Sequence, residues 1–429
     1  MGFKTADMPP VDPAQFESMP FMDRMRMLAT HWCEYGFGSP KQLHMLYVYK
    51  LIFYVLGGVA VVALTTPDLG FDVASWWGEP VVYQKLMVWT VLFEILGLAS
   101  SSGPLAFKFK PFIGGCLYFA RRKTLRVPPW PRKVPFTAGD HRTTFDVGLY
   151  FAILATLGFL LVHPGAATDA LPGSAAGLLP QWGMLTYVAL IIVMGLRDKV
   201  VFLAARSEQY VAVMFFFGIL SNHVDMILAA KIAMVTIWLG AGVSKFGHHF
   251  TNVVPPMVSN TPWITSRAFK RALYRDFPND LRPSKVAWAF AHVGGTVVEL
   301  VLPLVLLFST NSTITWLAIA GMIIFHLFIT STFPLAVPLE WNVFFMFAVA
   351  FLFAGFPAGA GYGVGDISSV PLLLGIVAVF VFFPILGNLR PDLVSFLPSM
   401  RQYAGNWASA TWAFRGDAAA DKLNRHVVK

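Results

Sequence analysis

The chain has 429 residues, of which 56% are hydrophobic and 15% aromatic, while only 13% are charged. One water-soluble core cannot bury that much apolar surface, so the composition excludes an ordinary soluble protein and predicts a membrane protein. The formal net charge of +9 lies in loops that lack the interleaved aromatic residues of a nucleic-acid groove. We therefore expect no nucleic-acid partner.

The apolar residues fall into blocks close to the roughly 20 residues that a helix needs to cross about 30 Å of hydrocarbon. The blocks are continuously apolar, which is not typical of the alternating strands of a membrane β-barrel. They predict an all-α polytopic membrane protein with about ten transmembrane helices, or nine if the fifth block does not cross. The predicted spans lie near 47–64, 81–101, 145–162, 182–196, 201–220, 224–245, 286–308, 313–333, 341–356 and 369–387.

The predicted organisation is one transmembrane helical domain, 47–387, between an N-terminal segment, 1–46, and a C-terminal tail, 388–429. Residues 1–46 lack the features of a cleavable signal peptide, so the first spanning helix is expected to direct insertion. The loops 102–144 and 246–285 are too short for a further domain. Within them, "FKFKPFIGGCLYFARRK" and "WITSRAFKRALYRDF" predict interfacial segments, the second an amphipathic helix with a basic face.

Positive charge is distributed unevenly between the loops. Residues 65–80 and 163–182 contain no lysine or arginine, whereas residues 107–133 contain Lys108, Lys110, Arg121, Arg122, Lys123, Arg126, Arg132 and Lys133. Because positively charged loops stay in the cytoplasm, this pattern predicts a plasma-membrane protein with both termini cytoplasmic. Cys33 and Cys116 then lie on the reducing side, so neither a disulfide nor a cysteine metal site is expected.

Five ionisable residues fall within the apolar blocks, where charge is costly unless it is paired or hydrated. They are Glu94, Lys231, Lys245, Glu299 and His326. Glu94 and Lys231 fit either a structural ion pair or a functional relay. Asp225 is six residues from Lys231 and does not share its helix face, so Glu94 or Glu299 is the expected partner of Lys231.

Lys245 ends an apolar run, and its plainest interpretation is a lysine that extends to the membrane interface. His292 and Glu299 are seven residues apart and are predicted to share a helix face. The adjacent His248 and His249 point in different directions, so they predict no metal site.

Three motifs suggest a more specific interpretation: "AGVSK" at 241–245, "HVGG" followed by Glu299, and "FH" at 325–326 followed by a broken helix and "NVFFMF". They resemble the membrane domain of vitamin K-dependent γ-carboxylases and the related bacterial HTTM proteins. The resemblance covers about residues 232–353 and implies that Lys245 is a general base that deprotonates a bound hydroquinone. One family glycine is Val293 here.

Two departures limit what the resemblance implies. The carboxylases have a large lumenal domain that holds the protein substrate, and no segment here is long enough to replace it, so protein carboxylation is not expected. The family chemistry also faces the lumen, whereas the charge pattern places Lys245 at the cytoplasmic side.

Our leading hypothesis is a membrane-embedded oxidoreductase-like or lipid-modifying enzyme that binds a quinone or another lipophilic substrate between the sixth, seventh and eighth helices. Lys245 would be the base, Glu299 would orient it, and His292 and His326 would carry protons or bind ring oxygens. The expected pocket walls are Phe325, Phe328 and Trp341. The alternative is a non-enzymatic lipid-binding transporter component or a scaffold of a cell-envelope complex. The predicted partners are the lipid bilayer, a lipophilic small molecule or lipid, and other membrane proteins.

Overall fold

The computed structural model describes residues 11–35, 41–98, 114–131, 133–171, 174, 176–248, 250–261, 263–332 and 339–389. The expected C-terminal tail from 390 onward, residues 107–113 of the first interfacial segment and the predicted break after 332 lie outside these residues. Within the described residues, the regular structure is helical except for one antiparallel hairpin and two isolated bridges, so the expected all-α fold has a small exception.

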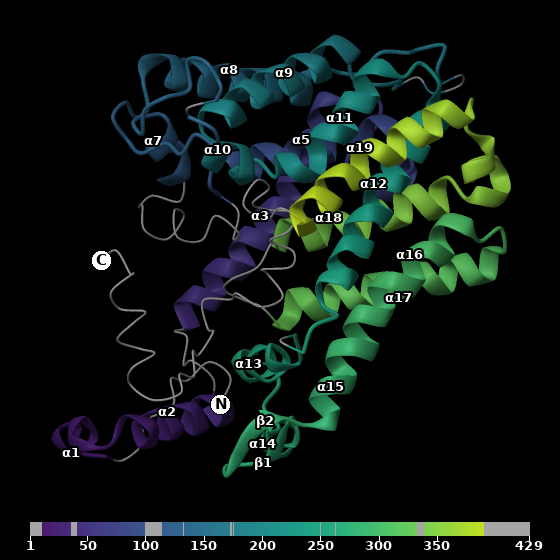
Figure 1. The fold of residues 1–429 in the computed structure, drawn as a ribbon. Helices are drawn as coiled ribbons and strands as arrows, with labels where there is room; N and C mark the ends of the chain where they lie inside the picture. Colours follow the sequence, from purple (N-terminus) through teal and green to yellow (C-terminus); the bar gives the residue numbers. More distant parts are fainter. Residues whose placement is uncertain are drawn as a thin grey trace.

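The helices follow one another in the order labelled in Figure 1. The α-helices and strands are α1 (Pro13–Ser18), α2 (Phe21–Tyr35), α3 (Lys41–Thr65), α4 (Val73–Trp76), α5 (Pro80–Ile95), α7 (Gly114–Phe119), α8 (Thr144–Val162), α9 (Gln181–Arg197), α10 (Lys199–Ala204), α11 (Ser207–Ile219), α12 (His223–Ser244), α13 (Val254–Asn260), α14 (Arg267–Ala272), β1 (Tyr274–Asp276), β2 (Asp280–Pro283), α15 (Lys285–Ala291), α16 (Val298–Phe308), α17 (Ser312–Thr332), α18 (Leu339–Val349) and α19 (Val370–Leu389). Two π-helices, His292–Val297 and Ala350–Gly355, continue α15 into α16 and extend α18.

Helical structure occupies each of the ten predicted ranges, but the ten-span count is not confirmed. Among the described residues, five helices are long and apolar enough to cross a membrane: Val48–Thr65, Thr144–Val162, His223–Val243, Lys285–Phe308 and Ser312–Thr332. A sixth span is formed if Glu340–Gly355 and Ala358–Asp366, which meet at 42°, count as one. Within the predicted span 201–220, the longer helix is α11, whose 13 residues extend about 20 Å.

The fifth predicted span, 201–220, is not one helix. Arg206 has φ 52° and ψ 37°, a left-handed conformation that ends α10 and begins α11 in a new direction. The Gln181 side chain at the start of α9 donates to the carbonyls of Phe217 and Leu220 at the end of α11. α9 and α11 therefore run antiparallel over a similar depth.

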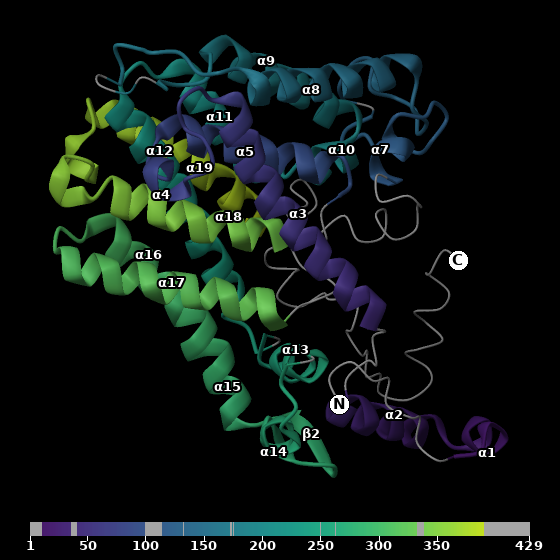
Figure 2. The same cartoon turned by 180° about the vertical axis from the view of Figure 1, so that it is seen from behind.

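The loops without lysine or arginine meet at one end of the helix bundle, which we call the acidic end. Ser174 of the α8–α9 loop donates to Glu79 at 2.9 Å, which joins the first two of these loops. The 356–369 loop lies at the same end. A Cβ on Gly355, the residue before this loop, would be 3.7 Å from the ring of Trp77 in the first loop. A Cβ on Gly359 would be 3.1 Å from the carbonyl oxygen of Thr310, in the turn between α16 and α17. Figures 1 and 2 show the α16–α17 turn and the loop before α19 at this end, far from α7.

The opposite end of the bundle, which we call the basic end, contains loops 121–142 and 246–285. There, the Asp198 carboxylate bonds to the Val127 amide at 3.2 Å and forms an ion pair with Arg142. The Thr261 hydroxyl donates to the Thr332 carbonyl at 3.1 Å, which joins the long loop to the end of α17. The uneven charge seen in the sequence thus becomes an asymmetry between two ends of the structure.

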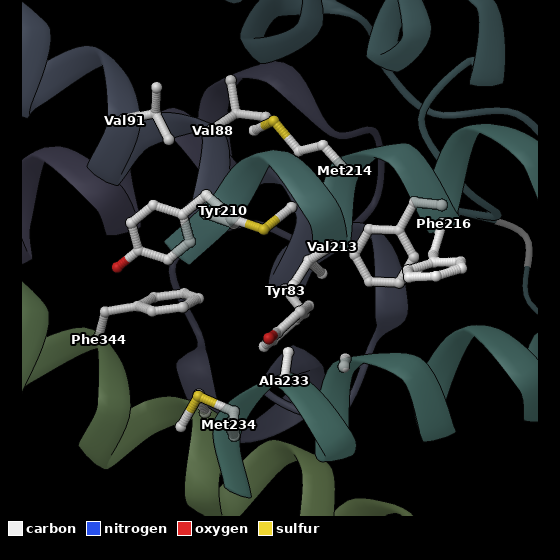
Figure 3. Packing of buried hydrophobic residues seen from close by; sticks show 14 of the residues in the cluster. Tyr83, Val88, Val91, Tyr210, Val213, Met214, Phe216, Ala233, Met234 and Phe344 are labelled. Atoms are coloured by element: carbon white, nitrogen blue, oxygen red, sulfur yellow. The ribbon is translucent and has the colours of Figure 1, made fainter. Parts of the chain in front are cut away.

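α12 lies at the centre of the bundle, and most of its apolar segment His223–Val243 is buried. Tyr83 of α5 stacks on Phe351 with ring centroids 4.8 Å apart and meets Phe217 edge-on at 6.1 Å. Figure 3 shows Tyr83 between Val213 of α11 and Ala233 of α12. This aromatic packing joins α5 to α11 and to the π-helix after α18, next to α12.

The predicted amphipathic helix is shorter and less exposed than expected. It is limited to α14, because the chain is extended in β1 from Tyr274. Lys270, expected on the polar face, is buried and donates to the Ser259 carbonyl at 3.0 Å. Arg271 pairs with Glu34 of α2 at 2.5 Å. The segment therefore packs on α2 and α13 rather than presenting a free basic face.

Candidate functional site

Lys245 and Glu299 form an ion pair near the basic end, between the end of α12 and the start of α16. Their side chains are 13% and 5% exposed, respectively. Gly242 makes this pair possible, because a Cβ at that position would be 3.0 Å from Leu300 and 3.2 Å from the Cβ of Glu299. The glycine of "AGVSK" thus lets α16 come close enough for its carboxylate to reach the lysine one turn later.

Two aromatic rings flank the Lys245 ammonium group. Its Nζ is 5.3 Å from the ring centre of Phe250 and 5.5 Å from that of Phe325, distances at which a cation is attracted to an aromatic ring. Phe250 belongs to a short 3-10 helix, Phe250–Asn252, after α12. A Cβ on Gly295 would be 3.3 Å from its ring, so the second glycine of "HVGG" leaves room for Phe250.

His292 begins the π-helix between α15 and α16. Its Nε2 is 3.2 Å from the Thr251 hydroxyl and its Nδ1 is 3.4 Å from that of Thr296. π-helical turns often occur at functional sites, because the extra residue redirects the side chains that follow. His292 and Glu299 both meet the segment Lys245–Thr251, but they contact different residues of it.

His326 is buried at the centre of a hydrogen-bonded row of side chains. The indole N–H of Trp238 donates to its Nε2 at 3.0 Å, and its Nδ1 is 2.8 Å from the Asn342 amide oxygen. Since an indole can only donate, Nε2 accepts and Nδ1 carries the proton, which defines a neutral imidazole. The row links α12, α17 and α18 and orients His326.

The three aromatic residues expected to line the pocket differ in position. Phe325 is the one that contacts Lys245. Phe328 lies 6.4 Å from Phe290 of α15, ring centre to ring centre. Trp341 packs on Phe345 at 5.3 Å, and Phe345 in turn contacts Trp238 and His326. Trp341 therefore supports the row around His326.

Glu94 and Lys231 are not part of this cluster, and the predicted pairing of Lys231 with Glu94 or Glu299 is wrong. Lys231 donates to the carbonyls of Phe356 and Tyr362, at 2.6 and 2.7 Å, towards the acidic end. Glu94 lies 3.5 Å from Arg206 at the basic end. A buried ammonium group can donate its hydrogen bonds to backbone carbonyl oxygens. These partners carry no net charge and therefore leave no charged residue to recognise in the sequence.

Sequence reasoning assigned no role to four residues that shape the site: Trp238, Gly242, Phe250 and Asn342. Gly242 and Asn342 do lie within the motifs "AGVSK" and "NVFFMF". Trp238 precedes Lys245 by seven residues, and this spacing is the signal that could have placed it on the same helix face. In the described part of the chain, no three His, Cys, Asp or Glu side chains gather as a metal site would require. His249 lies outside the described residues.

The fold and the site together define a multi-spanning helical membrane protein with a charged pair set among aromatic rings. The chain belongs to the family described as "Transmembrane protein of unknown function (DUF3556)", whose sequence profile matches residues 1–429. No curated protein and no solved structure matches the chain.

Proposed function

We propose that the protein binds a quinone or a similar lipophilic molecule between α12, α16 and α17, and that Lys245 acts on it as a general base. The observation that carries the proposal is the shielded Lys245–Glu299 pair, flanked by the rings of Phe250 and Phe325. Aromatic side chains beside a polar pair suit a flat ring that carries oxygen atoms. The motif resemblance to the γ-carboxylase and HTTM proteins supports the same ligand class.

Glu299 gives the lysine its chemistry in this proposal. A lysine paired with a carboxylate carries a proton and cannot accept another one. Transfer of that proton to Glu299 leaves two neutral groups, an arrangement favoured where water is excluded. The Lys245 amine then removes a proton from a hydroxyl group of the ligand, and His292 holds a ring oxygen in place. His326, whose two nitrogens are hydrogen-bonded to Trp238 and Asn342, holds α12, α17 and α18 together beside the ligand.

The proposed setting is the plasma membrane, with both termini and the basic end in the cytoplasm. Support comes from the two ends of the bundle, because loops 66–79, 163–180 and 356–369 contain no lysine or arginine. The Lys245 site then lies near the cytoplasmic surface of the bilayer.

The test is mass spectrometry of organic-solvent extracts from protein purified in mild detergent, comparing wild type, Lys245→Met and Lys231→Met. Lys231 is a matched control, because it is a buried lysine of the same helix that bonds to carbonyls away from the site. We expect a co-purified quinone in wild type and Lys231→Met and its loss in Lys245→Met. A lipid retained equally by all three proteins would refute a role for Lys245 in binding.

A non-enzymatic lipid-binding component or scaffold is the second candidate, and one observation favours it. Lys245 and Glu299 neutralise each other, and both nitrogens of His326 are hydrogen-bonded. The cluster can therefore serve as a purely structural polar contact between helices. A structural contact of this kind tolerates replacement of both Lys245 and Glu299 by apolar residues. The double variant Lys245→Met/Glu299→Met distinguishes the two, since a scaffold keeps its co-purifying partners and a quinone enzyme loses its ligand.

A further inference from the structure

The loop 121–142, which follows α7, is fixed to the ends of two helices at the basic end. The Val127 amide donates to the Asp198 carboxylate at 3.2 Å, and the Lys199 amide, just after α9, donates to the Val127 carbonyl at 2.9 Å. Arg142 pairs with Asp198, and the span α8 begins two residues after it. Figures 1 and 2 show this part of the chain at the edge of the molecule, beside α7, α8 and α10. The loop therefore lies at the depth where α8 and α9 end.

A buried arginine gives the loop a fixed shape. The Nε of Arg126 donates to the His141 carbonyl at 3.1 Å, and its Nη1 lies 3.6 Å from the Asp146 carboxylate of α8. Leu125 and His141 form a backbone bridge. Arg126 is buried, whereas Leu125 and Val127 on either side of it are exposed. This alternation is typical of an extended segment, and it turns the two apolar side chains outward.

Phe136 is also held outward. Its side chain is 92% exposed, the highest value for a large apolar residue in the described part of the chain. Its φ of 61° is rare for a bulky residue and costs free energy. The Phe136 carbonyl accepts a hydrogen bond from Arg197, and the Ala138 carbonyl accepts one from Arg126 at 2.5 Å. Both arginines pair with Asp146, so an ion-paired network holds an aromatic ring away from the protein.

Positive charge accompanies these apolar side chains. The exposed cations of the loop are Arg121, Arg122, Lys123 and Lys133. The loop contains one carboxylate, Asp140, which bonds to the neighbouring His141 at 2.6 Å. Trp130 is exposed as well, and tryptophan is enriched where proteins meet the headgroup layer of a membrane. The surface of the loop thus combines a strong excess of positive charge with exposed apolar and aromatic side chains.

This combination suits the surface of an anionic bilayer. Apolar side chains can enter the boundary between headgroups and acyl chains, while lysine and arginine side chains bind the phosphates above it. An acidic protein would match the charge equally well. The attachment of the loop at the ends of α8 and α9 favours the lipid, because it keeps the loop beside the headgroups.

We propose that loop 121–142 is a binding surface for anionic phospholipid headgroups. Leu125 and Phe136 insert below the phosphates, and Arg121, Arg122 and Lys123 bind them. This surface is independent of the Lys245 site and its ligand.

The test is native mass spectrometry of the full-length protein in mild detergent, titrated with phosphatidylglycerol or with zwitterionic phosphatidylcholine. We expect wild type to bind phosphatidylglycerol several-fold more tightly, and the variant Arg121→Gln/Arg122→Gln/Lys123→Gln to lose most of this preference. The matched control is Arg275→Gln/Arg282→Gln/Lys285→Gln, which removes three exposed cations elsewhere at the basic end and should keep the preference.

Two results of this titration would overturn the proposal. Equal affinity of wild type for the two lipids would leave an acidic protein as the occupant of the loop. The same loss of preference in both triple variants would show a general effect of net charge rather than a surface on this loop.

Fluorescence quenching measures the insertion directly. In a background without Cys33 and Cys116, Phe136→Cys and Asp140→Cys each carry an environment-sensitive fluorophore, in lipid nanodiscs that contain phosphatidylglycerol and a quencher on the acyl chains. We expect several-fold stronger quenching at position 136 than at position 140, an exposed polar site of the same loop. Equal quenching at both positions would refute insertion. These single substitutions at exposed residues decide the question even if the triple variant does not fold.

Discussion

The two lysines of α12 show how position sets the role of one residue type. Both interrupt an apolar run, yet Lys231 is held by two carbonyl oxygens near the acidic end and Lys245 by a carboxylate near the basic end. The sequence identifies both as costly residues that need partners. It does not identify the partners, because these come from segments 54 to 131 residues away along the chain.

At Lys231, we predict a structural rather than a functional effect. Lys231→Met leaves the carbonyls of Phe356 and Tyr362 without their donor, which costs about 1–3 kcal/mol. The check is the denaturation midpoint in mild detergent, with exposed Lys133→Met as the control. An unchanged midpoint for Lys231→Met would show that water replaces the lysine without loss.

The two cysteines are predicted to differ in reactivity. Burial raises the pKa of the Cys33 thiol, whereas Cys116 is only partly buried. Since the thiolate is the reactive form, we expect a maleimide to label Cys116 well before Cys33 at neutral pH. Time-resolved peptide mass spectrometry measures both rates in one sample, and equal rates would contradict the packing of α2 on α13.

At the scale of elements, helix breaks, π-helices and a hairpin interrupt the continuous helices that the apolar blocks predict. The blocks locate the helices, but the turn at Arg206 divides 201–220, and π-helices occur within the continuous blocks 286–308 and 341–356. The basic segment after Trp263 forms a helix only as far as Ala272, since its next residues pair in a hairpin. Hydropathy is insensitive to each of these changes, because they alter backbone geometry without altering composition.

The contact of α12 with α16 provides a prediction at this scale. Gly242→Val places methyl groups against Leu300 and Glu299, so we expect the helices to separate and stability to fall by about 1–3 kcal/mol. Gly240→Val is the matched control, because a Cβ there meets no atom within 4 Å. Thermal unfolding of both variants is the measurement, and the same loss in both would point to glycine flexibility rather than the contact.

At the scale of the whole molecule, the charge asymmetry of the loops becomes two distinct ends. In a background without Cys33 and Cys116, we predict that Asp169→Cys reacts with an impermeant maleimide added to intact cells. Lys133→Cys should react only after the cells are opened, because its loop carries the positive charge that stays in the cytoplasm. The reverse pattern would place the Lys245 site near the outer surface.

The sequence by itself determined that this is a helical membrane protein, approximately where its helices lie, and which ionisable residues are costly in lipid. Composition and local periodicity suffice for that, because the bilayer imposes the same requirement on every segment. Only the tertiary structure decided that Glu299 pairs with Lys245, that Lys231 bonds to carbonyls, and that Glu94 pairs with Arg206. These pairings depend on helix rotation and on close approach at residues such as Gly242, and neither is encoded within any single segment.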